Sequence, residues 1–383
     1  MFEALIRFVR EQYRTNDFIP LHAPVFKGRE RDYVVDTIES TFVSSVGAYV
    51  DRFESDMAAY TACGKAVAVV NGTAALHIAL LLAGVKPGDL VITQSLTFVA
   101  TCNAISYCNA EPVFVDVDRH TLGLSPKSLE AWLTDNAHVD PDGVCRAKAD
   151  KRVLRACVPM HTFGHPVELD LLVSVCKRWS ITLVEDAAES LGSFYKGRHT
   201  GTFGALGTLS FNGNKIMTTG GGGMILTDQA LGQRAKHLTT TAKRPHPFEF
   251  FHDEVGFNYR LPNLNAALGC AQLEQLETFI LAKRELASRY AGHFANTSVQ
   301  FVCEPAGCRS NYWLNAVICE SREQRDAFLK ATNDKGVMTR PIWALMNRLP
   351  MYADCRRGDI SNAEWLEARV INLPSSVNSG VAP

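Results

Sequence analysis

Thr208-Leu-Ser-Phe-Asn-Gly-Asn-Lys-Ile-Met-Thr-Thr-Gly-Gly-Gly-Gly223 sets one lysine, Lys215, between small polar residues and four glycines. The next segment, Met224-Ile-Leu226, predicts a buried strand, so the lysine stands at the border of the core. A partly desolvated amine is more readily neutral and can then attack a carbonyl carbon. From this stretch alone, such a reactive amine and an ordinary loop lysine beside a flexible glycine turn remain equal alternatives.

The upstream stretch Ile181-Thr-Leu-Val-Glu-Asp-Ala-Ala-Glu-Ser-Leu-Gly-Ser193 supplies a carboxylate that suits this lysine. Its first four residues predict a strand, and Asp186 follows at the carboxyl end, where open parallel sheets bind ligands. Pyridoxal phosphate requires such a pair, because an acid keeps its pyridine nitrogen protonated and an amine holds its aldehyde. The alternative role for Asp186 is a helix N-cap before Ala187 and Ala188.

Residues 66–76, Ala-Val-Ala-Val-Val-Asn-Gly-Thr-Ala-Ala-Leu, predict a buried strand, a glycine turn and the start of a helix. Free N–H groups at Gly72, Thr73 and Ala74 could hold an anion there, helped by the helix dipole. The same pattern also fits a capped helix start without a ligand. Phe98, just past the next predicted strand, either stacks on a cofactor ring or packs in the core.

The composition describes an ordinary globular chain of 383 residues with 46% hydrophobic types. A net charge of -1 gives no basic field for nucleic acid or an anionic membrane, which argues against both partners. The N-terminus predicts an amphipathic helix rather than a signal peptide, and the apolar runs are too interrupted to span a bilayer. Eleven cysteines without a C-x-x-C pair indicate free thiols and a cytoplasmic location.

Alternating strands and helices between residues 61 and 270 predict an α/β fold with a mostly parallel sheet between helices. We expect an N-terminal helical arm over 1–60, a large domain over 61–270, and a bridging helix with a small C-terminal α+β domain over 271–383. Polar residues 135–150 and the aromatic stretch 243–253 are expected to be loops. The segment 256–269 is expected to begin a helix that continues through 273–290.

Two histidines, His161 and His165, have a spacing that would suit metal ligands on a helix. Gly164 and Pro166 make this segment a loop instead, and no Glu or Cys nearby in the sequence completes a ligand set. We therefore expect no metal site.

With these residues in view, the chain resembles the fold-type I, pyridoxal-phosphate-dependent sugar aminotransferases of the DegT/DnrJ/EryC1/StrS family from about Ile19 to Ser376. Seven ordered stretches carry the resemblance: Asn71-Gly-Thr-Ala-Ala-Leu, Thr97-Phe-Val-Ala-Thr, Glu185-Asp-Ala-Ala-Glu-Ser-Leu-Gly, Ser210-Phe-Asn-Gly-Asn-Lys, Gly220-Gly-Gly-Gly, Gly256-Phe-Asn-Tyr-Arg and Thr339-Arg-Pro. Within the family the chain looks most like the LegC-type enzymes of legionaminic acid synthesis, through the segment 42–54 and the form of the lysine loop.

The resemblance implies a role for each matching residue. Lys215 becomes the internal aldimine and proton shuttle, Asp186 the partner of the pyridine nitrogen, and Glu189 a neighbour of the ring hydroxyl where many relatives carry Gln. The phosphate, the ring face and the substrate anions would be contacted by a further set: Gly72, Thr73, Ser210 and Asn212 for the phosphate, Asn258 for the phosphate of a neighbouring subunit, Phe98 for the ring, and Arg260 and Arg340 for the substrate.

The implied function is amino transfer from glutamate to a nucleotide-linked keto-deoxy-sugar, of the UDP-4-keto-6-deoxy-GlcNAc type with amination at C4, for surface polysaccharide or nonulosonic acid synthesis. Alternatives are C3 amination, a GDP- or dTDP-linked sugar, or a keto-sugar acid. A pyridoxal-phosphate-dependent sugar dehydratase is less favoured, because in those relatives a histidine replaces the lysine. A non-catalytic regulator would need an added DNA-binding domain. The resemblance also implies a homodimer with shared active sites.

Overall fold

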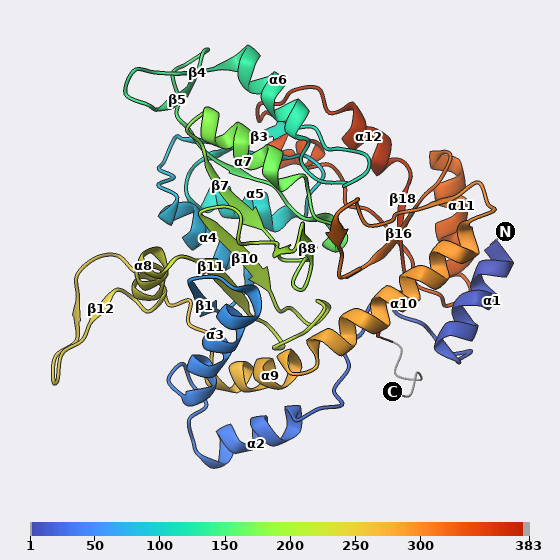
Figure 1. Ribbon diagram of the computed structural model, residues 1–383, viewed down its shortest axis with the longest axis horizontal. Coiled ribbons are helices and arrows are strands. Elements are labelled where there is room, and N and C mark those ends of the chain that lie inside the picture. The colour runs from blue at the N-terminus through green and yellow to red at the C-terminus, as the bar shows by residue number, and fades with distance from the viewer. Residues whose placement is uncertain (1, 378–383) are drawn as a thin grey trace.

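The computed structural model describes residues 2–377, and a seven-stranded sheet forms its centre (Figure 1). The strand order is β1-β11-β10-β7-β6-β2-β3. Six strands run parallel, and only β11 is antiparallel to its neighbours β1 and β10. The strands are β1 (Lys65–Val69), β2 (Leu90–Gln94), β3 (Glu111–Val115), β6 (Leu154–Val158), β7 (Thr182–Asp186), β10 (Leu206–Ser210) and β11 (Gly223–Thr227). The predicted mostly parallel sheet is confirmed.

Helices cover both faces of this sheet, as its nearly continuous apolar strands require. One face packs against α4 (Gly72–Leu82), α5 (Val99–Tyr107) and α8 (Gln229–Thr239). The other face packs against α3 (Ala48–Thr61) and α9 (Asn263–Leu273) at one end, and against α6 (Pro126–Asn136) and α7 (Leu169–Arg178) at the other. Successive residues of β1 alternate between the two cores, with Val67 in one and Ala68 in the other.

A second, antiparallel sheet of four strands lies in the C-terminal part, in the order β14-β16-β18-β17. Its strands are β14 (Gln300–Phe301), β16 (Asn315–Ile318), β18 (Val370–Leu373) and β17 (Arg340–Pro341). The long helix α10 (Leu276–Phe294) leads into this part, and α11 (Arg322–Asn333) and α1 (Phe2–Tyr13) pack beside it (Figure 1). The first helix of the chain therefore packs with the C-terminal sheet, whereas α2 (Glu30–Glu39) lies against α9.

The helix expected to begin within 256–269 starts only at Asn263, directly after Pro262. The residues before it are extended, and Asn258 and Arg260 form isolated bridges with Thr240 and Val69. The expected continuous helix is also divided, because α9 ends at Leu273 and α10 begins at Leu276. At this break the side-chain amide of Gln275 donates a hydrogen bond to the buried carboxylate of Glu30, which ties the junction to α2.

Both expected loops contain short hairpins. The first holds β4 (Ala137–Val139) and β5 (Cys145–Ala147), and the second holds β12 (Lys243–Arg244) and β13 (Phe251–His252), which project from the body of the protein (Figure 1). The remaining elements are the small sheet of β8 (Phe194–Tyr195), β9 (Arg198–His199) and β15 (Cys308–Arg309), helix α12 (Ser361–Glu367), and 3-10 turns at Thr162–Gly164, Met346–Arg348 and Pro350–Tyr352. All eleven cysteines are free thiols, as predicted. Within residues 2–377 no helix is long and apolar enough to cross a bilayer.

Candidate active site

A cavity of about 300 Å³ lies at the carboxyl ends of β7 and β10 and at the start of α4. Eight of the eleven residues singled out in the sequence line it: Gly72, Thr73, Phe98, Asp186, Glu189, Ser210, Asn212 and Lys215. The fold therefore brings together residues that are up to 143 positions apart in the chain, from 72 to 215. Parallel strands place their carboxyl ends at one edge, which explains the gathering.

Asp186 is the last residue of β7 and its side chain is buried. The carboxylate accepts hydrogen bonds from the Thr101 hydroxyl at 2.7 Å and from the Ala188 N–H at 3.2 Å. Burial raises the pKa of Asp186, and the hydrogen bond from Thr101 and the charge of Lys215 oppose that rise. Residues 187–193 form turns and no helix, so the alternative role of Asp186 as a helix N-cap is wrong.

Lys215 lies in the turn after β10, and its side chain is 12% exposed. Its Nζ atom is 3.3 Å from Oε1 of Glu189 and 4.0 Å from the ring centroid of Trp313. The other carboxylate oxygen of Glu189 accepts a hydrogen bond from the Phe163 N–H at 2.9 Å. Burial raises the pKa of Glu189, while the charge of Lys215 lowers it. The amine thus stands between a buried carboxylate and an aromatic face.

The start of α4 forms the opposite end of the cavity. Asn71 caps this helix by accepting a hydrogen bond from the Ala74 N–H at 2.8 Å. The expectation that the Ala74 N–H is free is therefore wrong, and the N–H groups of Gly72 and Thr73 remain at the open helix end. A Cβ atom on Gly72 would lie only 2.9 Å from Cβ of Ser210, so glycine is what allows these two segments to approach so closely.

Aromatic side chains form one wall of the cavity. Phe98 is 48% exposed and lines the cavity, so the alternative of core packing is wrong. Its ring centroid lies 6.3 Å from that of Trp343, and Trp313 lines the cavity as well. Both tryptophans come from the C-terminal part of the chain, and sequence reasoning missed them. Trp313 lies in none of the seven motifs, whereas Trp343 follows the Thr339-Arg-Pro341 motif by two residues, which was the one signal that could have found it.

The donor set of the cavity fits pyridoxal phosphate. The cradle between Gly72 and Ser210 offers N–H and hydroxyl donors at a helix N-terminus, which favours a phosphate group. Asp186 offers a buried carboxylate for a pyridinium nitrogen, and Lys215 offers the amine for an aldehyde. Phe98 offers a flat apolar face for the ring.

Three of the predicted residues lie outside this cavity in their own chain. The side-chain oxygen of Asn258 accepts two hydrogen bonds from the Arg260 guanidinium, at 3.0 and 2.8 Å. Arg260 lines a second cavity of about 660 Å³ beside the β12–β13 hairpin, together with Lys243 and Arg244. Arg340 is exposed and donates to the backbone oxygen of Thr339.

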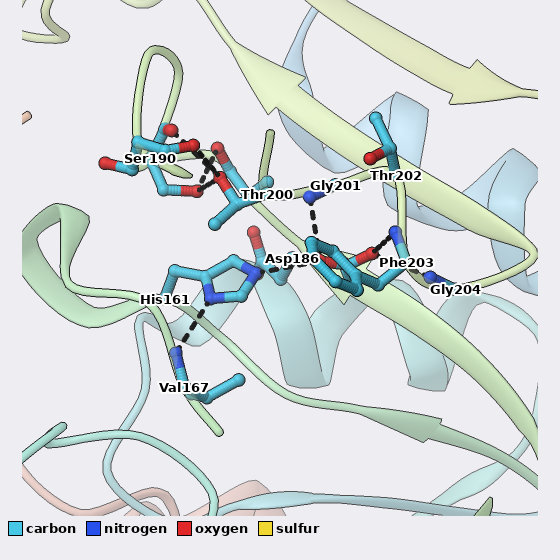
Figure 2. A network of polar contacts seen from close by, with 12 residues as sticks. His161, Val167, Asp186, Ser190, Thr200, Gly201, Thr202, Phe203 and Gly204 are labelled. Atoms are coloured by element: carbon cyan, nitrogen blue, oxygen red, sulfur yellow. Dashed lines mark hydrogen bonds and ion pairs between the residues drawn. The ribbon is translucent and has the colours of Figure 1, made fainter. Parts of the chain in front are cut away.

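A buried polar network surrounds Glu185, the residue before the last one of β7 (Figure 2). Glu185 is completely buried and accepts hydrogen bonds from the N–H groups of residues Gly201, Phe203 and Gly204, at 2.7, 2.6 and 2.7 Å. Its carboxylate also lies 3.1 Å from Nε2 of His161. These contacts explain why the pKa of Glu185 stays low in spite of burial.

This network also fixes the loop that carries His161. The His161 N–H donates to the backbone oxygen of Asp186 at 3.2 Å, which aligns the loop after β6 with the end of β7. The fold brings Glu185 to His161 from the neighbouring strand, although the two residues are far apart in the sequence. Glu185 pairs with this histidine directly, and His165 packs edge-on against Tyr312 instead.

Comparison with known proteins agrees with this geometry. Residues 24–380 match the model of the DegT/DnrJ/EryC1/StrS aminotransferase family. The GDP-perosamine synthase of Escherichia coli O157:H7 is 37% identical, with 94% of this chain and 93% of that protein covered, and the one of Caulobacter vibrioides is 35% identical over 93% of each. The crystal structure of the aminotransferase TlmJ from Streptoalloteichus hindustanus superposes with a TM-score of 0.84 at 28% identity, with 95% of each chain covered. The chain therefore belongs to the DegT/DnrJ/EryC1/StrS aminotransferase family and is a pyridoxal-phosphate-dependent sugar aminotransferase.

Proposed function

We propose that the enzyme transfers the amino group of glutamate to a nucleotide-linked keto-deoxy-sugar. One observation carries this proposal: the amine of Lys215 and the buried carboxylate of Asp186 face a single cavity that also contains an anion cradle. A lysine at this position favours transfer over dehydration, since the resembling dehydratases have a histidine there.

Each residue of the cavity then has a defined task. When bound, pyridoxal phosphate supplies an electron sink for the bonds at the carbon that carries the amino group. Lys215 would hold the aldehyde carbon of the cofactor, and its Nζ atom is the group in the cavity that would move protons. Asp186 keeps a proton on the pyridine nitrogen, and its burial strengthens this interaction because the local dielectric is low. Glu189 would lie beside the ring hydroxyl when the cofactor is bound, and it is the partner of Nζ in the cofactor-free protein.

The remaining lining residues hold the cofactor in place. Gly72, Thr73, Ser210 and Asn212 bind the phosphate through backbone N–H groups, a hydroxyl and an amide. Phe98 would cover one face of the ring. Together they fix the ring so that Lys215 reaches its reactive carbon, which is the positioning that accelerates a bimolecular step.

For the sugar, a GDP-linked keto-deoxy-sugar is the first candidate, because relatives with 37% and 35% identity are named GDP-perosamine synthases. The second candidate is the UDP-4-keto-6-deoxy-GlcNAc type with amination at C4, which the LegC-like segments of the sequence favour. Arg340, exposed on the edge strand β17 of the C-terminal sheet, is proposed to contact an anionic group of the substrate.

We further propose a homodimer in which Asn258 and Arg260 serve the cavity of the partner subunit. Both lie outside the active-site cavity of their own chain, and Arg260 lines the second cavity together with Lys243 and Arg244. Large apolar side chains stand exposed on the neighbouring hairpin, with Phe248 at 90% and Phe250 at 81%. Such exposure is unusual for a monomer and typical of a protein interface. The eleven unpaired thiols suit a reducing compartment such as the cytoplasm.

The test is an incubation of the purified enzyme with ¹⁵N-glutamate and a panel of GDP-, UDP- and dTDP-linked keto-sugars together with a keto-sugar acid, read by mass spectrometry. We expect one class to gain a labelled amine in place of its keto oxygen, and Lys215→Ala to give none. A product that has lost water without gaining nitrogen would replace transfer by dehydration. Label in a keto-sugar acid but in no nucleotide-linked sugar would overturn the substrate class.

A further inference from the structure

Helix α10 contains a lysine, Lys283, that is completely buried. Its Nζ atom donates hydrogen bonds to two backbone oxygens, that of Trp313 at 3.0 Å and that of Ser375. No carboxylate pairs with it in the part of the chain that the structure describes. Burial lowers the pKa of Lys283 to about 7. An apolar residue would fill this position at lower cost, so the lysine needs a reason beyond packing.

Lys283 joins three segments that are distant in the sequence. Trp313 precedes β16 and Ser375 follows β18, and because these two strands are antiparallel with Asn315 opposite Leu373, the lysine ties α10 to one end of the C-terminal sheet. The Ser375 hydroxyl accepts the Asn315 N–H at 2.8 Å, which strengthens the same junction. Lys283 therefore holds the backbone carbonyl group of Trp313.

The amide side of Trp313 is held too. Its N–H donates to Oδ1 of Asn311 at 2.8 Å, and the amide of Asn311 donates to the backbone oxygens of Glu189 and Leu191, both at 2.9 Å. Both polar groups of the Trp313 backbone thus have buried partners. The point from which the indole side chain extends is therefore fixed, and the ring itself is held by a contact of its own.

The indole ring then reaches the lysine loop. Its Nε1–H donates to the backbone oxygen of Asn214 at 2.7 Å, one residue before Lys215. The ring centroid lies 4.0 Å from Nζ of Lys215. A continuous set of contacts therefore runs from Nζ of Lys283 through Trp313 to Nζ of Lys215.

We propose that Lys283 is a positioning residue for Lys215, acting through Trp313: it holds the indole that orients the Lys215 loop and its amine in the cavity. This inference rests on the proposed role of Lys215 as the lysine that holds the cofactor. Burial lowers the pKa of His22, and the charges of Lys283 and Lys215 lower it further; neither of its ring nitrogens has a hydrogen-bond partner among the described residues. It is therefore neutral and places no charge against either lysine.

The test compares Lys283→Met with a matched control on the same helix, Tyr290→Phe. Methionine keeps the length of the side chain but leaves the oxygens of Trp313 and Ser375 without their donor. Tyr290 is also completely buried and donates to the oxygen of Pro374 at 3.0 Å, next to Ser375, but it has no contact with Trp313. Both variants therefore weaken the same junction, and only one touches the path to Lys215.

Cofactor-free proteins are mixed with pyridoxal phosphate, and the rate at which the visible band appears is followed by stopped-flow absorbance. We expect Lys283→Met to slow this step roughly tenfold, since small misplacements of a reacting group cost that much or more. Tyr290→Phe should stay within twofold of wild type. The double variant Lys283→Met/Trp313→Phe should be no slower than the slower single variant, because both act on one path.

A rate for Lys283→Met within twofold of wild type overturns the proposal, and so does equal slowing in Tyr290→Phe. If Lys283→Met cannot be purified in a folded form, Lys283→Leu, which also lacks a donor, replaces it under the same criteria. The ¹H–¹⁵N resonance of the Trp313 indole, assigned by its loss in Trp313→Phe, gives a readout that does not depend on cofactor. It should shift in Lys283→Met but not in Tyr290→Phe. An adduct on a lysine other than Lys215 in wild type would instead refute the proposed function, while this resonance still reports on Lys283.

Discussion

Nζ of Lys215 lies 3.3 Å from Oε1 of Glu189, and both groups are nearly shielded from water. In the cofactor-free protein this carboxylate is therefore the direct partner of the amine. The second oxygen of Glu189 is held by the Phe163 N–H, whose residue has a positive φ of 57°. A non-glycine residue in that conformation is strained, and such strain gathers at functional sites. The backbone at Phe163 thus helps to fix the carboxylate that faces the amine.

The first prediction concerns the identity of the lysine. Purified protein loaded with pyridoxal phosphate should show a visible absorbance band, and borohydride reduction with peptide mapping should place the adduct on Lys215. Lys215→Ala should lose the band, because the amine that bonds the aldehyde is gone. Lys236→Ala is the control, because the amine of Lys236 pairs with Glu54 outside the cavity. This variant should keep the band. An adduct on another lysine would disprove the assignment.

The second prediction is that Asp186→Asn folds and binds cofactor but loses about 100-fold or more in turnover, since a neutral amide cannot hold the pyridinium proton. Single-turnover kinetics with glutamate would measure the loss. Asp116→Asn is the matched control: Asp116 is also buried, but it accepts hydrogen bonds from Asn362 and Ala363 away from the cavity. It should lower thermal stability and leave turnover of the folded protein close to wild type. Comparable turnover in Asp186→Asn would refute the role given to Asp186.

The third prediction concerns pH. The pKa of Glu189 is raised by burial in the cofactor-free protein, so the native state binds this proton more tightly than the unfolded chain does. This group therefore makes the protein less stable as pH rises from the ordinary pKa of Glu, near 4, through the raised value. Cofactor-free Glu189→Gln should have a higher Tm than wild type at pH 8. The difference should vanish at acidic pH, where both proteins carry a neutral side chain. A Tm difference that does not change with pH would contradict the raised pKa.

The fourth prediction tests the anion cradle. Gly72→Ala adds a Cβ atom 2.9 Å from Cβ of Ser210, so the two segments must separate and the phosphate donors move apart. We expect the Kd for pyridoxal phosphate to rise roughly tenfold, in line with about 1 to 3 kcal/mol for overpacking. Gly213→Ala is the control, because a Cβ atom there has no neighbour within 4 Å. Equal Kd values for both variants in equilibrium dialysis would show that the cradle does not depend on this close approach.

Local patterns in the sequence were sufficient to predict the sheet and the principal groups of the cavity. The apolar strand before Asp186 and the glycine turn at Gly72 each indicate which end of a parallel strand they occupy, and the sheet then brings them together. The environment of Lys215 from the C-terminal part could not be predicted in this way. Trp313 reaches Lys215 only because a separate sheet packs against α10, and no spacing in the sequence records that contact. Glu185 and His161 likewise meet across neighbouring strands rather than along the chain.

The last prediction is that the active unit is a homodimer with two shared sites. Asn258 and Arg260 bond to each other outside the cavity of their own chain, next to a hairpin with strongly exposed aromatic side chains. If Asn258 serves the partner subunit, a mixture of Lys215→Ala and Asn258→Ala chains should form hybrids in which one site has both defects and the other has neither.

Activity of the mixture should then exceed that of either variant alone, approaching about a quarter of wild type when random exchange makes half of the dimers hybrids with one intact site each. Native mass spectrometry would confirm that the chains have exchanged, and Arg340→Ala in place of Asn258→Ala provides a comparison for a residue outside the hairpin region. Exchange without recovery, or a fully active monomer in light scattering, would rule out shared sites. Recovery would require that the intact site be built from the Lys215 of one chain and the Asn258 of the other, because neither variant chain carries both.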